Sequence, residues 1–181
     1  MKKSLISLQI KPSPIGGKGI FTQKEIQPNQ IVFRLEGPTI QYPTEPDWHT
    51  QPNALQVGPN TWKIPLTGNV WKYINHSCKP NAGLRGRSNV VAMRPIFPGE
   101  EVTIDYSITE SGHNWHMRCR CGLPECRRVI KGAQYLSREL YAEYEEFIPT
   151  YLRQVYNKQK TYATQQGELS QFICQTPIKK R

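Results

Sequence analysis

The 181-residue chain has no apolar run long enough to cross a bilayer. A basic start, Met1-Lys2-Lys3-Ser4, is followed at residues 5–10 by a stretch too short and too polar for the apolar core of a signal peptide. The chain also lacks the G-x-x-x-x-G-K-[ST] and G-x-G-x-x-G patterns of phosphate-binding and dinucleotide-binding loops. These absences favour a soluble intracellular protein that does not use a nucleotide-binding loop of either kind.

Acidic residues are scarce. The chain has 14 Asp and Glu and 24 Lys and Arg, which gives a net charge of +10. Residues 1–112 contribute +4 (12 basic, 8 acidic) and residues 113–181 contribute +6 (12 basic, 6 acidic). A basic chain attracts polyanions, so nucleic acid is a possible partner. A basic surface that serves only solubility is the alternative.

The five cysteines do not form a disulfide framework, because their number is odd and no secretion signal accompanies them. Three of them form the pattern Cys119-x-Cys121-x4-Cys126, which indicates a metal site. A structural zinc ion takes four protein ligands in a tetrahedron, so a fourth must come from elsewhere in the chain.

Cys78 is the favoured fourth ligand, and His113 and His116 are the rival candidates. Cys174 then remains as the spare thiol. Four protein ligands leave no open position for water, so the site would be structural. Its thiolates must be deprotonated to bind zinc, and folding of this segment should depend on metal and pH.

Two further motifs bear on the function of the chain. The run Gly68–Asn81 contains Asn75-His76-Ser77-Cys78, and Gly99–Tyr106 reads Gly-Glu-Glu-Val-Thr-Ile-Asp-Tyr. Together with the cysteine cluster, these motifs resemble those of the SET-domain protein-lysine methyltransferases that end in a cysteine-rich post-SET segment. The resemblance covers roughly residues 8–130.

This resemblance implies S-adenosylmethionine as the cofactor and one structural zinc ion held by Cys78 with the three clustered cysteines. It implies Tyr106 as the catalytic residue. Lys72 stands where an arginine is common in the family, so a planar fork of donors is lost there. The cofactor-binding residues that it implies are Lys18, Gly19, Phe21, Lys72, Tyr73, Asn75, His76 and Trp115.

Methyl transfer from a sulfonium to lysine needs a neutral amine in an in-line position. Burial in an apolar channel lowers the lysine pKa from near 10.4, and the channel also holds the amine in place. Tyr106 would orient the amine or the methyl group and need not be a strong base. Ile104 lies two residues earlier, where relatives carry Tyr or Phe, and it offers no hydroxyl to restrain the amine. This favours the addition of more than one methyl group. The alternative is that Tyr73, Tyr42 or Trp71 supplies the missing hydroxyl or wall.

The fold expected is mostly β (α+β), with short strands bounded by Pro and Gly near residues 5–10, 20–21, 31–35, 54–57, 61–64, 90–94 and 102–106. Residues 37–53 are expected to form a loop-rich insertion without a regular element. The resemblance adds a knot-like threading near the active site. After Gly132, apolar residues recur at helical spacing, and Pro149 should kink this helix or start a second one.

The domain boundaries predicted are a SET domain at 5–107, a post-SET zinc segment at 108–131, a C-terminal helical extension at 132–160 and a flexible tail at 161–181. Residues 157–171 are rich in Gln, Thr and Lys, and the helix end is expected to fray there.

The favoured function is methylation of a lysine-containing protein, such as a histone or another basic protein, with no membrane partner. The alternative is a non-catalytic zinc-containing module that binds chromatin or nucleic acid. The location would be cytoplasmic in a bacterium, with a nuclear or host-directed destination as the alternative. Substrate, target lysine, source and oligomeric state are left open by the sequence.

Overall fold

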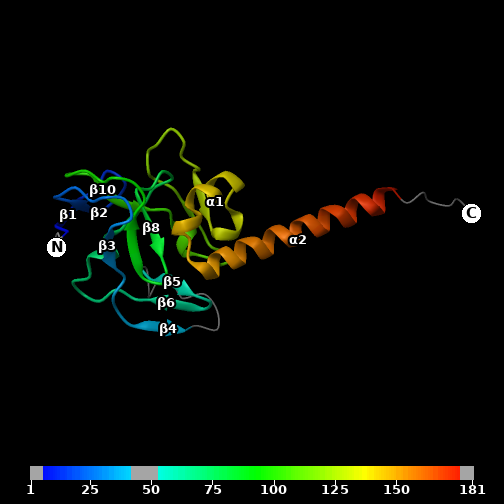
Figure 1. The fold of residues 1–181 in the computed structure, drawn as a ribbon, viewed down its shortest axis with the longest axis horizontal. Helices are drawn as coiled ribbons and strands as arrows, with labels where there is room; N and C mark the ends of the chain where they lie inside the picture. The colour runs from blue at the N-terminus through cyan, green and yellow to red at the C-terminus, as the bar shows by residue number, and fades with distance from the viewer. Residues whose placement is uncertain (1–5, 42–52, 176–181) are drawn as a thin grey trace, which may run out of the picture.

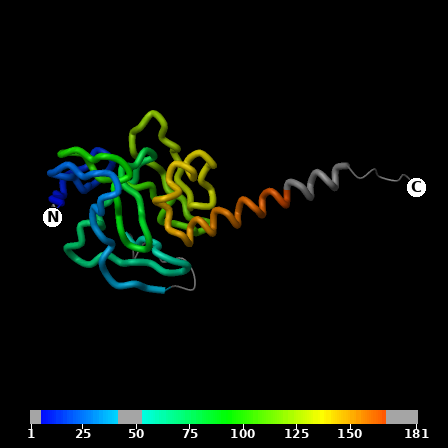
Figure 2. Tube along the Cα trace, viewed as in Figure 1, coloured from blue at the N-terminus to red at the C-terminus, as the bar shows by residue number. Residues whose placement is uncertain are grey.

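The computed structural model describes residues 6–41 and 53–175, and for residues 167–175 it describes the backbone alone. The described part is a strand-rich body from which one long helix projects (Figure 1). In Figure 2 the coloured trace begins within this body and ends along the helix. The expected mostly β, α+β class is confirmed.

The first sheet places the two main motifs side by side. Its strand order is β1-β2-β10-β7, formed by β1 (Leu8–Pro12), β2 (Lys18–Thr22), β10 (Glu101–Ile104) and β7 (Asn75–His76). β7 runs parallel to β10, with Thr103 opposite Asn75 and Ile104 opposite His76. The segment that begins at Tyr106 therefore starts directly beside the Asn-His-Ser-Cys motif. The knot-like threading stays a prediction.

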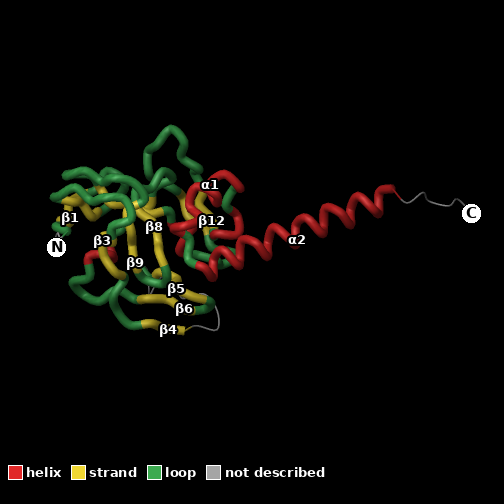
Figure 3. The backbone as a smooth tube through the Cα atoms, in the orientation of Figure 1, coloured by secondary structure: helices red, strands yellow, loops and turns green. Residues whose placement is uncertain are grey.

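Three smaller sheets complete the body. β3 (Ile31–Arg34), β9 (Asn89–Ala92) and β8 (Ala82–Arg85) form the second, and β4 (Thr39–Gln41), β6 (Thr61–Lys63) and β5 (Leu55–Gly58) form the third. A two-stranded sheet joins β11 (His116–Arg118) to β12 (Val129–Lys131). Figure 3 shows these strands gathered in one body, with α1 and α2 at one side of it.

Tight turns and buried strand residues fix this arrangement. Gly17 and Gly99 have φ values of +56° and +86°, which side chains rarely adopt, and each precedes a strand of the first sheet. Strand residues fully shielded from water build a core shared by the sheets and the helices. Its fully buried members include Ile20, Leu84, Val90, Val102, Ile104 and Leu152.

The helical region consists of η3 (Ala133–Tyr135), α1 (Arg138–Tyr144), η4 (Glu145–Phe147) and α2 (Thr150–Gln175). The Ser137 side chain accepts a hydrogen bond from the Leu140 amide and caps α1. Pro149 starts a second helix, in agreement with one of the two alternatives, and its carbonyl accepts a hydrogen bond from the Leu152 amide (2.9 Å). Short η1 (Val70–Tyr73) and η2 (Tyr106–Thr109) follow other strands.

Several sequence expectations need correction. Residues 37–53 are not devoid of regular structure, because β4 pairs with β6 there, with Ile40 opposite Trp62. The first strand lies at 8–12 rather than 5–10, since its register is set by pairing with β2. The expected strands do not include β7, β8, β11 and β12, and β7 has only two residues.

The C-terminal helix does not end or fray at 157–171. α2 continues through this segment to Gln175, so the flexible tail predicted at 161–181 is helical over its first fifteen residues. The reason is local, because residues 161–175 contain good helix formers such as Ala, Gln, Glu and Leu, no proline and one glycine. None of the helices in the described part is both long and apolar enough to cross a membrane.

Replacement of Leu152 by alanine should lower the free energy of unfolding by about 2–5 kcal/mol, because this fully buried side chain would leave a cavity between α2 and the strand body. Urea denaturation followed by circular dichroism measures the change. The control is Gln154→Ala on the exposed side of the same helix, which should stay within about 0.5 kcal/mol of the wild type. Equal stabilities for the two variants would contradict this packing.

Candidate functional site

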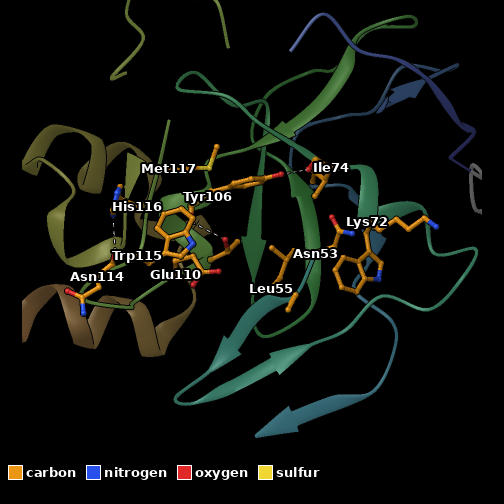
Figure 4. A pocket seen from close by; sticks show the side chains of 13 residues that line it. Asn53, Leu55, Lys72, Ile74, Tyr106, Glu110, Asn114, Trp115, His116 and Met117 are labelled. Carbon is orange, nitrogen blue, oxygen red and sulfur yellow. Dashed lines mark hydrogen bonds between the residues drawn. The ribbon is translucent and has the colours of Figure 1, made fainter. Parts of the chain in front are cut away.

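Tyr106 stands between two cavities and contributes to the wall of each. It begins η2, directly after β10 and Asp105. Its hydroxyl donates a hydrogen bond to the carbonyl oxygen of Ile74 at 2.6 Å, as Figure 4 shows. Because the hydroxyl hydrogen is used in this way, the lone pairs of the oxygen remain free to accept a hydrogen bond from a ligand.

The first cavity has a volume of about 460 Å³, within the range of small-molecule sites. Its wall is mostly apolar and aromatic, and Glu110 is the acidic residue among those that line it. The side chains labelled in Figure 4 come from segments far apart in the sequence, which surround Tyr106. The lining residues are Asn53, Ala54, Leu55, Trp71, Lys72, Ile74, Tyr106, Thr109, Glu110, Asn114, Trp115, His116 and Met117.

The second cavity has a volume of about 490 Å³ and a different character. Three segments meet there. They are the glycine-rich loop at residues 16–19, the Asn-His pair of β7 and the segment around β11. Two arginines contribute positive charge, and no acidic residue of the described chain lines the wall. The lining residues are Ile15, Gly16, Gly17, Asn75, His76, Tyr106, Met117, Arg118 and Arg120.

Tyr106 is a neutral phenol at physiological pH. Burial, aided by the negative charge of Glu101, raises its pKa to about 12. Deprotonation would therefore be less favourable than for a free tyrosine. The side chain suits an orienting and hydrogen-bonding role and does not suit a general base.

His76 is a neutral bridge between the active-site segment and the cysteines. Its Nδ1 accepts a hydrogen bond from the Tyr106 amide at 3.1 Å, and its Nε2 lies 3.4 Å from the Cys78 sulfur. This pattern assigns the proton to Nε2. Burial lowers the pKa of His76 to about 4, with a smaller lowering by Arg127, and nearby Asp105 only partly opposes this. Its side chain therefore positions Tyr106 as well as lining the second cavity.

The four predicted cysteines come together from two distant segments. The sulfur atoms of Cys78, Cys119, Cys121 and Cys126 all lie within 4.8 Å of one another. A tetrahedral zinc site with Zn–S bonds of about 2.3 Å has sulfur–sulfur separations of about 3.8 Å, so this donor set fits zinc. Within residues 6–41 and 53–175, no His, Asp or Glu belongs to this cluster, His113 and His116 included.

Backbone amides support the cluster. The amide of Arg127 donates to the Cys78 sulfur at 3.3 Å, and the amide of Arg128 donates to the Cys126 sulfur at 3.4 Å. Such hydrogen bonds stabilise thiolate charge around a metal. Cys174, the expected spare thiol, lies in the part of α2 whose side chains are not described.

An ion pair anchors the cysteine segment to the residue before Tyr106. Asp105 is fully buried and binds the guanidinium of Arg127, while its other oxygen accepts from the Ser107 amide at 2.9 Å. Arg127 also donates to the Ser107 hydroxyl at 3.2 Å. No sequence pattern predicts this pair, because the two partners lie 22 residues apart.

The glycine-rich loop is fixed by the side chains around Glu101. Asn75 donates from its amide nitrogen to the Lys18 carbonyl (3.0 Å) and to the Glu101 carboxylate (2.7 Å). The Ser13 hydroxyl donates to the other carboxylate oxygen of Glu101 at 2.8 Å. Gly19 packs directly against this carboxylate, so a side chain at that position would displace it.

The residues expected to bind the cofactor do not share one cavity. Asn75 and His76 line the second cavity, whereas Lys72 and Trp115 line the first. The remaining four line neither, and they are Lys18, Gly19, Phe21 and Tyr73.

Three of the eight expected residues form a cluster of their own. The ammonium groups of Lys72 and Lys18 lie 4.9 and 5.8 Å from the ring centre of Tyr73. Lys72 therefore contributes to the wall of the first cavity and to this cluster, and it is absent from the second cavity.

Sequence reasoning missed Met117, Arg118 and Arg120 as residues of the second cavity, although they stand next to the predicted metal ligands. Met117 also lines the first cavity. The signal that could have found them is their position, since a segment tied to Cys78 by a metal must also lie close to Asn75 and His76. Tyr42, a candidate source of a second hydroxyl, lies outside the described residues.

Relatives of known identity resemble a part of this chain. "Histone-lysine N-methyltransferase 2B" from Homo sapiens is 27% identical over 144 residues, which cover 71% of this chain and 5% of the relative. "Histone-lysine N-methyltransferase, H3 lysine-36 specific" from Candida albicans is 30% identical over 141 residues, which cover 69% of this chain and 17% of the relative. The chain thus spans less than a fifth of the length of either.

A solved structure has the same fold. The crystal structure of KRYPTONITE in complex with mCHH DNA, an H3(1–15) peptide and SAH matches with a TM-score of 0.56 at 21% identity, over 72% of this chain and 30% of the other. The family model of the SET domain matches residues 17–107, which is half of the chain and includes the glycine loop, the Asn-His-Ser-Cys motif and Tyr106. The chain therefore belongs to the SET domain family.

Proposed function

We propose that this protein transfers methyl groups from S-adenosylmethionine to the ε-amino group of a lysine in a protein substrate. The observation that carries the proposal is the position of Tyr106 in the walls of two separate cavities. Methyl transfer from a cofactor to a protein side chain needs two binding sites that meet at one reacting centre. The family membership and the names of the relatives support the same reaction.

The second cavity fits the cofactor, which supplies an electrophilic methyl group on a positively charged sulfur. A Cβ atom added to Gly16 or Gly17 would meet no other atom within 4 Å, so open space lies against the backbone of the loop. Asn75 fixes this loop through the Lys18 carbonyl and Glu101. Neutral His76 adds no positive charge to the wall.

The first cavity fits the substrate lysine. Leu55, Trp71, Ile74 and Trp115 give it an apolar and aromatic wall that excludes water. Removal of water lowers the pKa of an amine, which raises the share of the neutral form that can attack a methyl group.

Tyr106 holds the amine at the junction of the two cavities. Its hydroxyl hydrogen is bound to the Ile74 carbonyl, so its oxygen accepts a hydrogen bond from the amine and directs the nitrogen lone pair. The amine forms a bond to the methyl carbon as the carbon–sulfur bond breaks. The methylated ammonium then releases a proton to solvent, and Tyr106 stays protonated throughout.

The lining of the first cavity favours more than one methyl group. Ile104 is fully buried in the core and does not line the cavity, and Tyr73 does not line it either. Tyr106 supplies the phenolic hydroxyl among the described lining residues, and Trp71, which does line the cavity, has no hydroxyl. With no second phenolic hydroxyl among the described lining residues, a methylated amine is less restrained against further turning and transfer.

The substrate class is best taken from the relatives, which are named as histone-lysine methyltransferases. A histone or another basic protein is therefore the proposed substrate. An intracellular location follows from this proposal, with the nucleus as the destination where histones are the substrate. Direct contact with nucleic acid is a further expectation, which rests on the net charge of +10.

The decisive experiment incubates zinc-replete protein with labelled S-adenosylmethionine and a panel of histones, ribosomal proteins and cell lysate, and maps the label by mass spectrometry. We expect label on lysine, with di- and trimethylated products. Tyr106→Phe should lower kcat about 10- to 100-fold, or about 1.4–2.8 kcal/mol in transition-state stabilisation, and leave cofactor affinity unchanged.

Tyr135→Phe, which removes an exposed hydroxyl outside both cavities, is the matched control and should retain full activity. A protein that binds no S-adenosylmethionine and labels no substrate would instead be the non-catalytic module. Binding to histones or nucleic acid by such a protein would then be measured directly.

The pH dependence of kcat separates an orienting tyrosine from a base. Because the pKa of Tyr106 is raised to about 12, its ionisation should produce no break below about pH 10. The rate should rise with pH as the substrate amine loses its proton and then level off. Tyr106→Phe should lower the plateau value of kcat and leave the pH midpoint of its rise unchanged. Disappearance of this pH midpoint in the variant would show that Tyr106 acts as the base.

The zinc ion is proposed to be structural, with one ion per chain. Metal analysis of reduced protein should find one zinc, and Cys126→Ser should lose it together with a large part of the cofactor affinity, because the segment beside the second cavity is no longer held. Cys174→Ser, which changes the predicted spare thiol, should keep the zinc. Full zinc content in Cys126→Ser would refute the assigned ligand set.

A further inference from the structure

The second cavity has a charge that the expected cofactor residues do not explain. Arg118 and Arg120 line it, and no Asp or Glu of the described chain lines it with them. The cation expected from the sequence is Lys72, but this side chain lies against Tyr73 and lines the other cavity. The positive charge in the second cavity therefore comes from the cysteine-rich segment.

The local backbone directs both arginines to one side. Arg118 ends β11, and its alternation with Cys119 and Arg120 is that of an extended chain. Cys119 turns to the sulfur cluster, which leaves Arg118 and Arg120 on the opposite side. The Cys119 amide also donates to the Arg128 carbonyl at 2.8 Å, so this direction is fixed by pairing as well as by the metal ligand.

Neither guanidinium has an ion-pair partner in the described part of the chain. Other arginines do have one, since Arg94 binds Glu100 at 2.5 Å and Arg127 binds Asp105. The carboxylate of Glu101 lies beside the glycine-rich loop, but Asn75 and Ser13 already donate to its two oxygens. Two exposed, unpaired guanidinium groups on the wall of one cavity are suited to bind an anionic ligand group.

We propose that Arg118 and Arg120 form the binding subsite for the carboxylate of the amino-acid half of S-adenosylmethionine. This inference rests on the proposed function. The carboxylate is the only anionic group of the cofactor, and a guanidinium binds a carboxylate through two parallel hydrogen bonds. The sulfonium and the ammonium are cations and are repelled by the same pair, so the arginines also select the orientation in which the carboxylate faces them.

This assignment gives the cysteine segment a direct role in cofactor recognition. The zinc site would hold two ligand-binding side chains that flank one of its own cysteines. It also supplies, from another segment, the planar forks of donors that Lys72 lacks where the family usually has arginine.

The test compares two ligands that differ by the carboxylate alone. Isothermal titration calorimetry measures the Kd of S-adenosylmethionine and of decarboxylated S-adenosylmethionine for the zinc-replete full chain and for Arg118→Ala/Arg120→Ala. We expect the double variant to bind S-adenosylmethionine at least about tenfold more weakly. Its affinity for the decarboxylated ligand should be unchanged or higher, because the repulsion of cationic groups is removed.

Lys131→Ala is the matched control, since it removes a positive charge from the same β11–β12 hairpin at a residue that does not line the cavity. It should leave both Kd values within about twofold, because exposed charges at a distance are screened by salt. Zinc content is measured in every variant, and Arg118→Lys/Arg120→Lys, which keeps the charge and loses the fork, should bind S-adenosylmethionine with intermediate affinity and full zinc.

Equal weakening of both ligands, or no weakening of either, overturns the carboxylate subsite while the proposed function stands. A wild-type protein that binds neither ligand overturns the proposed function itself. If the alanine variant loses zinc while the lysine variant keeps its full zinc content, the arginines stabilise the thiolate cluster instead. This result also overturns the subsite.

Discussion

The buried ion pair of Asp105 and Arg127 holds the functional part of this protein together. Asp105 is shielded from water and directly precedes Tyr106, while Arg127 directly follows the last cysteine of the cluster and gives its amide hydrogen to Cys78. A buried carboxylate is tolerated only when it is paired, and removal of one partner typically costs about 3–5 kcal/mol. The pair therefore stabilises a single docked position of the cysteine segment against the segment of Tyr106.

Both cavities depend on that docked position. The stretch from Trp115 to Met117 completes the first cavity, and the stretch from Met117 to Arg120 completes the second. A zinc ion held by the clustered cysteines would thus influence the second cavity without touching a ligand, because Cys119 and Cys121 adjoin Arg120 in its wall. His76 reinforces this link, since one ring nitrogen accepts from the Tyr106 amide and the other contacts the Cys78 sulfur. The cysteine cluster and Tyr106 are therefore joined through His76.

The two cavities differ in their polarity and charge. The first is mostly apolar, which in the proposed reaction suits a lysine that must lose its charge before it reacts. The second has two unpaired cations, which suit the anionic end of a ligand whose other groups are positive. Tyr106 is a neutral phenol, whose pKa burial raises further to about 12, and it separates the two cavities without adding charge to either. In the proposed reaction, methyl transfer would take place at Tyr106, where the two cavities meet.

The sequence alone determined the family, most of the longer strands, an interruption of the C-terminal helical region at Pro149 and the four cysteines that come together in a cluster suited to zinc. These features are carried by residue type, spacing and local backbone preference, which a chain displays before it folds. Only the tertiary structure decided which residues share a cavity: it separated Lys72 from Asn75, joined Asp105 to Arg127 and brought Arg118 and Arg120 to the glycine loop. These contacts join residues far apart in the chain through strands as short as β7, whose two residues carry no periodicity, so the burial and pairing that select them exist only in the folded state.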